Sequence, residues 1–148
     1  MFDHNDDDVT RKEDRLAQGY DTILKESALL TTFAGILFGF LLEISINTPE
    51  NFALGDKIIL LLSLFSITIA ASLFVMPVVY HHLQYPYKDL DKFKIRSHRF
   101  IVFGLIPAGI TLFLGLELAL SSLLDRFPAF MLAAIPFVVV YILFRMRK

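Results

Sequence analysis

The residues of this chain best suited to handling ions or protons are glutamates that stand beside or inside long apolar runs. Glu43 lies roughly 22 Å along its run from Ala28, and Glu117 lies roughly 26 Å along its run from Phe100, at a rise of ~1.5 Å per residue. Ionisable side chains inside a membrane are costly and often functional. At this depth two interpretations stay open: carboxylates at helix ends that reach water, or a pair of proton or cation sites at the mouth of a pathway.

Glu26 stands at the start of the first apolar run, where a carboxylate complements the dipole of a helix that begins there. A second interpretation is a charge network with basic side chains that flank the other runs, because a carboxylate near membrane depth is more favourable when it is paired. Histidines in such a network would make it sensitive to pH near neutrality. The basic candidates are His81, His82, Arg96 and Arg99.

Other kinds of chemistry find little support in the sequence. The chain has no Cys, which excludes thiol catalysis and Cys-based metal sites. His81 and His82 would point about 100° apart on a helix, and neither has a partner four residues away. No phosphate loop, catalytic triad or cofactor fingerprint occurs. We therefore expect a protein that is not an enzyme, with no metal site, no cofactor and no nucleic-acid partner.

The elements that must position these residues are four apolar runs. Of the 148 residues 55% are hydrophobic, the mean hydropathy is +0.60, and the charged residues gather outside the runs. A helix of about 20 residues matches the thickness of the hydrocarbon core. We therefore predict an all-α polytopic membrane protein in which a four-helix transmembrane bundle covers residues 28–144, with spans at about 28–46, 58–79, 100–120 and 127–144.

The basic residues predict the orientation of these spans in the lipid bilayer. Of the 14 Lys and Arg residues, four precede the first run, five lie between the second and third runs and three follow the fourth, which leaves only Lys57 and Arg126 on the other side. Because Lys and Arg gather on the cytoplasmic side, we expect both termini in the cytoplasm. Glu26 then lies at the inner mouth of the bundle, and Glu43 and Glu117 lie at the outer mouth.

The segments outside the runs have their own patterns. Residues 1–27 are expected to form an acidic cytoplasmic tail, disordered over 1–8, and then an amphipathic helix over 11–25 that Gly19 weakens. Pro77 is expected to kink or end the second span. Residues 145–148 form a basic cytoplasmic tail, and the Tyr-rich basic segment 80–99 is typical of a belt at the lipid surface.

Small residues at helical spacing mark faces on which helices can approach closely. Gly35 and Gly39 form such a pair in the first run, and Ala129 and Ala133 form another in the fourth. Packing inside one bundle and contact with a second copy of the chain both remain open for Gly35 and Gly39.

Three segments, 24–42, 76–82 and 96–99, resemble a prokaryotic family of unknown function whose members are small four-pass membrane proteins. They carry Glu26 followed by Leu-Phe-Gly-Phe-Leu-Leu, then Pro-Val-Val-Tyr-His, then Arg-x-x-Arg. Members of that family typically carry Arg where this chain has His82, and some carry an automatic label of sodium:proton antiporter. The resemblance implies four spans in the prokaryotic cytoplasmic membrane and adds almost nothing about activity.

Two functions compete on the residues alone. Transport needs a polar path, and proton relays and cation sites usually place carboxylates at mid-depth. Here the middle of the runs offers only Ser and Thr, and the fourth run offers neither. We therefore expect an accessory or structural subunit that packs with other membrane helices, as a homo-oligomer or in a larger membrane complex. The alternative is an oligomeric ion or proton channel or transporter.

Overall fold

The computed structural model describes residues 4–84 and 90–147 and contains four helices there. Each helix is long and apolar enough to cross a membrane, which confirms the all-α, multi-pass architecture. Every helix extends past the apolar run that predicted it, because flanking residues continue the helical backbone. The helices are α1 His4–Ile46, α2 Leu54–Gln84, α3 Leu90–Ser121 and α4 Arg126–Met146.

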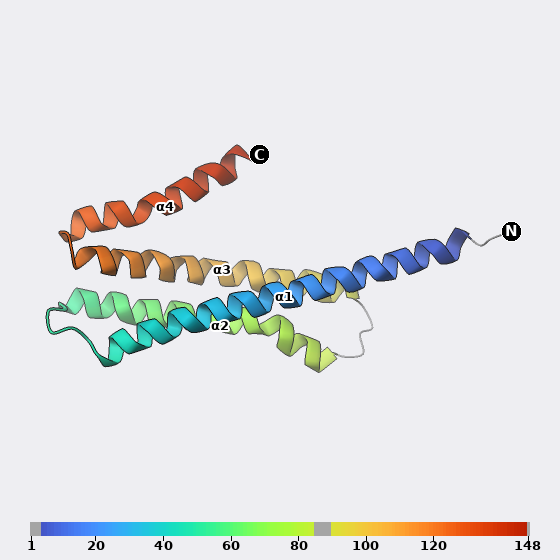
Figure 1. Cartoon of the computed structure of the whole chain (residues 1–148), viewed down its shortest axis with the longest axis horizontal. Helices are drawn as coiled ribbons and strands as arrows, with labels where there is room; N and C mark the ends of the chain where they lie inside the picture. Colours follow the sequence, from blue (N-terminus) through green and yellow to red (C-terminus); the bar gives the residue numbers. More distant parts are fainter. Residues whose placement is uncertain (1–3, 85–89, 148) are drawn as a thin grey trace.

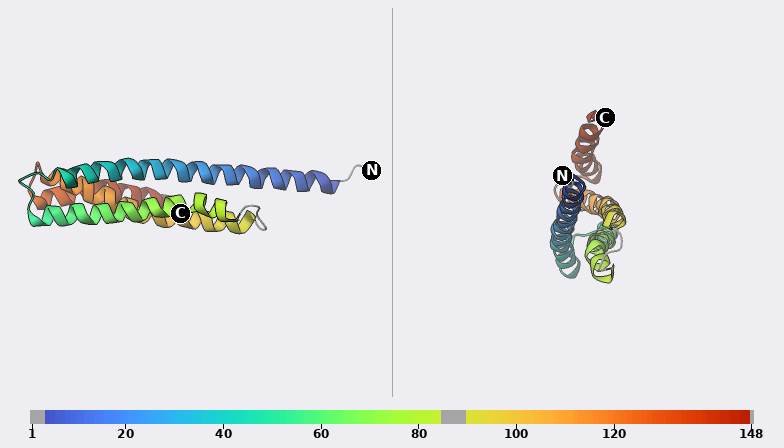
Figure 2. Two further views of the ribbon diagram at one scale, coloured as in Figure 1. Left: turned by 90° about the horizontal axis from the view of Figure 1, so that it is seen from below. Right: turned by 90° about the vertical axis from the view of Figure 1, so that its right-hand side faces the viewer.

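Three of the helices pack together and the fourth lies to one side. The backbones of α1, α2 and α3 contact one another, whereas the backbone of α4 lies close to that of α3 alone. Figure 1 shows α4 diverging from α3 toward the C-terminus, and the right-hand view of Figure 2 shows it standing apart from the other three. The described residues therefore form a three-helix bundle with α4 attached at one edge. In a membrane the open faces of such a helix meet either lipid tails or another helix, because lipid tails are as apolar as leucine side chains.

α1 is one helix from His4 to Ile46, and this corrects the expectation of a disordered segment over 1–8. The acidic residues from Asp6 onward are helical, and the backbone is not broken at Gly19. Once the apolar part of a helix has formed, each further residue gains a backbone hydrogen bond without a new nucleation cost, so the helix spreads outward. Residues 1–3 lie outside the described part of the chain.

Pro77 lies inside α2, which continues to Gln84. Proline has no amide hydrogen, so the Leu73 carbonyl loses its usual intrahelical donor. One residue further along, the Ser27 hydroxyl of α1 donates to the Phe74 carbonyl, and Ser27 is fully buried. Neighbouring helices stabilise membrane helices at proline in this way, by supplying polar partners to the altered backbone.

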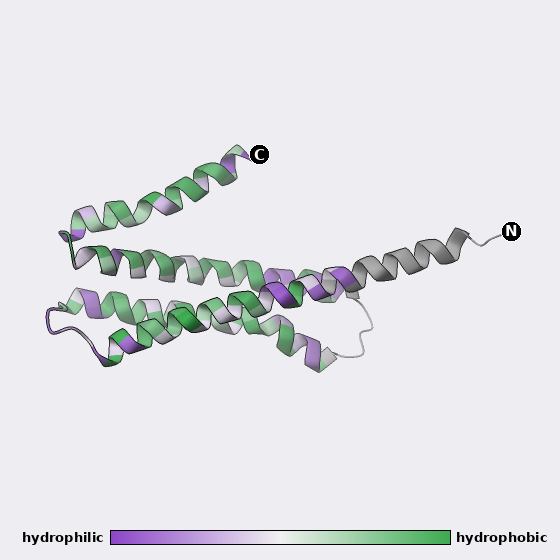
Figure 3. Ribbon diagram, viewed as in Figure 1, coloured by the Kyte–Doolittle hydropathy of each residue, from purple (hydrophilic) through white to green (hydrophobic). Residues whose placement is uncertain are grey.

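The apolar core lies between α1, α2 and α3. Phe74 belongs to this core and is fully buried. Its ring has room because Gly104 of α3 has no side chain. A β-carbon at Gly104 would lie 2.6 Å from Phe74 Cε1. Figure 3 shows hydrophobic colouring along α2, α3, α4 and the second half of α1, with hydrophilic residues mostly near the ends of these stretches. The core residues are Ala34, Leu41, Leu60, Ile67, Ala70, Phe74, Ala108 and Leu118.

Candidate functional site

The segments 47–53 and 122–125 connect their helices at the same end of the molecule, which we call the double-loop end (Figure 1). Asp56, in the first turn of α2, accepts a hydrogen bond from the Ala53 amide at 2.9 Å. Its other oxygen, Oδ1, lies 2.6 Å from Arg126 Nη2. Arg126 opens α4, so this ion pair joins the start of α4 to the start of α2.

Gly55 makes room for the arginine. A β-carbon at Gly55 would lie 2.5 Å from Arg126 Nη1 and 2.9 Å from Nη2, so the guanidinium lies directly over the glycine. The absence of a side chain at Gly55 therefore lets the guanidinium approach Asp56 and turn its Nε toward α3.

Glu117 of α3 faces this guanidinium from inside the protein. Only 4% of the residue is exposed, which corrects the expectation that its carboxylate reaches water. Glu117 Oε1 lies 3.8 Å from Arg126 Nε, too far for a hydrogen bond. The second oxygen, Oε2, is buried and has no hydrogen-bond partner. A buried carboxylate oxygen without a partner is costly, so Glu117 is the most unusual polar group among the described residues.

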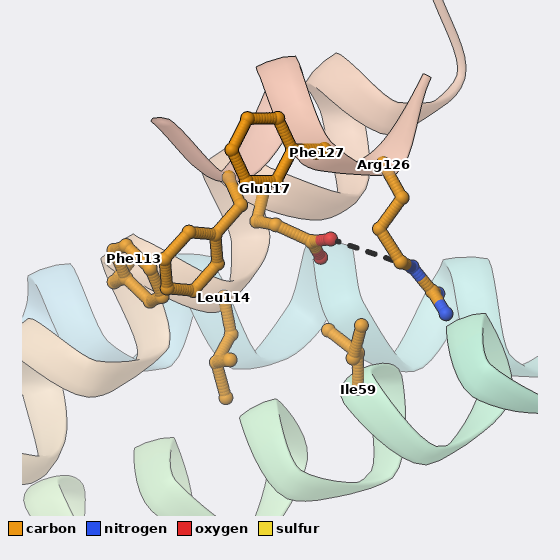
Figure 4. Close-up of a pocket in the computed structure, with 7 residues that line it drawn as sticks. Ile59, Phe113, Leu114, Glu117, Arg126 and Phe127 are labelled. Atoms are coloured by element: carbon orange, nitrogen blue, oxygen red, sulfur yellow. Dashed lines mark ion pairs between the residues drawn. The ribbon is translucent and has the colours of Figure 1, made fainter. Parts of the chain in front are cut away.

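Glu117 lines a cavity of about 540 Å³ between α2, α3 and α4, which we call the Glu117 cavity. Figure 4 shows the carboxylate extending toward Arg126, with aromatic rings on one side and Ile59 on the other. The lining is otherwise apolar apart from the arginine, and Phe113 is fixed there by edge-to-face contacts with Phe130 and Phe137. The lining residues are Ile59, Phe113, Leu114, Glu117, Arg126, Phe127 and Phe130.

The two carboxylates predicted at one mouth do not share a cavity. Glu43 is exposed and lines a separate hollow of about 250 Å³ along α1, together with Gly35 and Gly39. Both glycines are exposed, and a β-carbon at either would meet no described atom within 4 Å. The described part of the chain therefore supplies no neighbouring helix to this face, and contact with a second chain stays a prediction.

The residues predicted to surround Glu26 lie at the opposite end of the molecule. Glu26 lines a cavity of about 440 Å³ between α1 and α3, where the one basic neighbour is His98. Arg99 and His98 line another hollow. Among the described side chains, no ion pair joins Glu26 to Arg96 or Arg99, and the proposed network stays a prediction.

The remaining basic candidates make contacts close to the end of α2. Arg96 donates a hydrogen bond to the Tyr80 hydroxyl at 2.9 Å and lies 5.9 Å from the centre of its ring. The rings of His81 and His82 lie 5.2 Å apart, centre to centre. The two contacts of Arg96 with Tyr80 join α3 to α2, whereas the two histidines both lie on α2.

Sequence reasoning missed three residues of these sites: Asp56, Arg126 and His98. Asp56 and Arg126 are 70 positions apart, so no local sequence pattern relates them. One signal could have joined them, because Arg126 is one of only two basic residues on its side of the predicted membrane and stands among several carboxylates. For His98 the signal is its position two residues before the apolar run of α3.

Comparison with known proteins adds a family but no activity. Neither the curated proteins nor the solved structures yield a match to this chain. The model of a family of unknown function, DUF6328, matches residues 9–147 and so covers all four helices. A match over nearly the whole length shows kinship across the entire membrane domain, and the chain therefore belongs to the DUF6328 family of unknown function.

Proposed function

We propose that this membrane protein is a non-transporting subunit that assembles through α1 and α4 with other membrane helices, either in a larger complex or with copies of itself. The observation that carries this proposal is the sparse packing of those two helices. In the most apolar window of α1 and of α4, 11% of the residues are buried, against 28% in α2 and 33% in α3.

The hollow along α1 supports assembly on that side. Gly35 and Gly39 leave the backbone of α1 open, and close backbone approach at small residues is a main source of helix association in membranes. α4 has long apolar side chains on its open faces, and those of Val140 and Leu143 are more than half exposed.

The hydroxyl groups along the middle of α2 and α3 favour a subunit that does not transport. The Thr111 hydroxyl donates to the Pro107 carbonyl at 3.0 Å and also approaches the Ser63 carbonyl at 3.4 Å. Ser63, Thr68 and Ser72 each donate to a carbonyl of α2 itself, at 2.7 to 2.8 Å. These hydroxyls bond to backbone carbonyls, and in the described helices the apolar stretches around them, 58–79 and 100–116, contain no Asp, Glu, Lys or Arg to receive an ion.

The orientation belongs to the same proposal. Lys and Arg are in excess at the end opposite the double-loop end. This excess supports cytoplasmic termini and a double-loop end outside the cytoplasm. Partners that dock on α1 and α4 would then approach within the bilayer, and the long start of α1 would extend into the cytoplasm.

Photo-crosslinking in native membranes tests the assembly. A photoreactive residue replaces Ile36 on α1, Val139 on α4 or, as the control, Ile69 on α2; all three positions are exposed to a similar degree. We expect crosslinks to a second polypeptide from Ile36 and Val139 and few from Ile69. Equal yields at all three positions, or none, would contradict a preferred docking surface.

Reconstitution tests the absence of transport. The purified protein in liposomes, with pH- and cation-sensitive dyes, should show no flux above that of empty liposomes. Flux that is lost in Glu26→Gln or Glu43→Gln would overturn the proposal in favour of the oligomeric ion or proton channel. Gly39→Ile is a companion variant, expected to change the oligomer size without unfolding the monomer, because the space beside Gly39 is open.

A further inference from the structure

We propose that the Glu117 cavity binds an organic cation: a primary ammonium group carried on an apolar body, whose N–H donates to Glu117 Oε2. This inference goes beyond the assembly proposed above, because it concerns a ligand site inside one chain. It rests on the charge balance at Glu117, on the unpartnered oxygen and on the lining of the cavity.

The charge balance comes first. Two carboxylates, Asp56 and Glu117, face a single guanidinium, that of Arg126. The guanidinium forms its short contact, 2.6 Å, with Asp56 and stays 3.8 Å from Glu117. When both carboxylates are ionised, these three side chains together carry one more negative charge than positive charge. Glu117, on the buried side, is the carboxylate that has no close cation.

The unpartnered oxygen of Glu117 shows where a hydrogen-bond donor would have to lie. Glu117 Oε2 is buried and accepts no hydrogen bond, although an ionised carboxylate has lone pairs on both oxygens. Arg126 is half exposed and lies on the Oε1 side. A ligand in the cavity that donates N–H to Oε2 would both neutralise the carboxylate and satisfy its free oxygen.

The residues that line the Glu117 cavity favour an organic cation over a metal ion. Three aromatic rings line the cavity, those of Phe113, Phe127 and Phe130. The face of such a ring attracts an organic cation, and the ring also buries the apolar part of that cation. A bare metal ion would need several oxygen or nitrogen ligands, and the described side chains contain no group of three that could hold one. A volume of about 540 Å³ suits a small organic molecule.

The same ammonium chemistry exists in two sources, free lipophilic amines and the headgroup of phosphatidylethanolamine. The binding experiment therefore uses the full chain in nanodiscs of phosphatidylcholine, which carries no N–H donor. The probe is 4-phenylbutylamine, compared with its uncharged analogue 4-phenylbutanol, and binding is measured by calorimetry against empty nanodiscs. We expect the amine to bind at least about tenfold more tightly than the alcohol, the difference typical of a hydrogen bond to a charged group.

Variants then assign the binding to Glu117. Glu117→Gln should weaken amine binding about tenfold or more while leaving alcohol binding unchanged, which also shows that the cavity is intact. Glu43→Gln removes an exposed carboxylate near the same end and should leave both affinities unchanged. Phe130→Leu should weaken the amine more than the alcohol, because it removes a ring but keeps apolar volume.

The lipid arm separates the two sources. Replacing part of the phosphatidylcholine with phosphatidylethanolamine should leave the amine affinity unchanged if free amines are the ligands, and should lower it by competition if the headgroup occupies the site. Both results support the shared ammonium chemistry. Equal binding of amine and alcohol to the unmodified chain, or amine binding that survives Glu117→Gln, would overturn the proposal.

Discussion

Glu117 shows how strongly the surroundings of one residue depend on its helix face. Its place near the end of an apolar run predicts an interfacial carboxylate, and Glu43, at the end of another run, is indeed exposed. Glu117 instead points between helices, at a cavity closed partly by Arg126 of the next helix. Position along the chain gives depth in the membrane, but the neighbouring helix determines whether water reaches the side chain.

Arg126 should stabilise the fold partly through Glu117. We compare Arg126→Gln in two chains, the unmodified chain and the Glu117→Gln variant. We expect the free energy of unfolding to fall by about 1 kcal/mol more in the unmodified chain, because there the substitution leaves the buried carboxylate of Glu117 without its cation. Unfolding in mixed micelles measures the four members of the cycle. Lys57→Gln, an exposed neighbour at the same end, is the control and should cost the same in both backgrounds.

Gly104 should tolerate no side chain. In Gly104→Ala the new methyl group would collide with the buried ring of Phe74, so we expect a loss of about 1–3 kcal/mol in the free energy of unfolding. Gly109→Ala is the matched control, because a β-carbon there meets no described atom within 4 Å. Thermal unfolding in detergent compares the two. Equal stability would mean that α2 and α3 separate more easily than the packing implies.

At the scale of the elements, the apolar runs predicted the existence of all four helices but not their full lengths. A run predicts a helix because twenty apolar residues can satisfy their backbone in lipid only by helical bonding. The polar residues beyond it carry no such signal, so the ten helical residues from Leu90 to Arg99 lie outside the predicted spans. The pairing of Asp56 with Arg126 also escaped prediction, because nothing local relates the starts of α2 and α4.

Ser27 should strengthen the contact between α1 and α2. In Ser27→Ala the Phe74 carbonyl beside Pro77 loses its donor from α1. We expect the free energy of unfolding to fall by about 0.6 kcal/mol, the average for interhelical hydrogen bonds in membranes, and by no more than about 1.7 kcal/mol. Thr32→Ala is the control, because Thr32 is exposed and bonds to the Ala28 carbonyl of its own helix. Denaturation in mixed micelles should show a clear effect for Ser27 and almost none for Thr32; the reverse order would contradict this role.

At the scale of the whole molecule, the distribution of basic residues predicts the sidedness. A reporter enzyme that is active only outside the cytoplasm should stay inactive when it is fused after Lys148, because twelve of the 14 Lys and Arg residues lie on the side of the termini. The control fusion follows Leu124, after the third helix, and should be active. Activity at Lys148 together with silence at Leu124 would reverse the orientation.

The length of α1 has a mechanical consequence. The helix begins at His4, whereas its membrane span begins at Asp21, and Figure 1 shows the intervening part projecting beyond the other helices. At ~1.5 Å per residue this part is a rod of roughly 25 Å. Its backbone continues into the apolar part of α1 without a break. A displacement of its free end is therefore carried along the same rod to Ser27, whose hydroxyl bonds to the Phe74 carbonyl of α2.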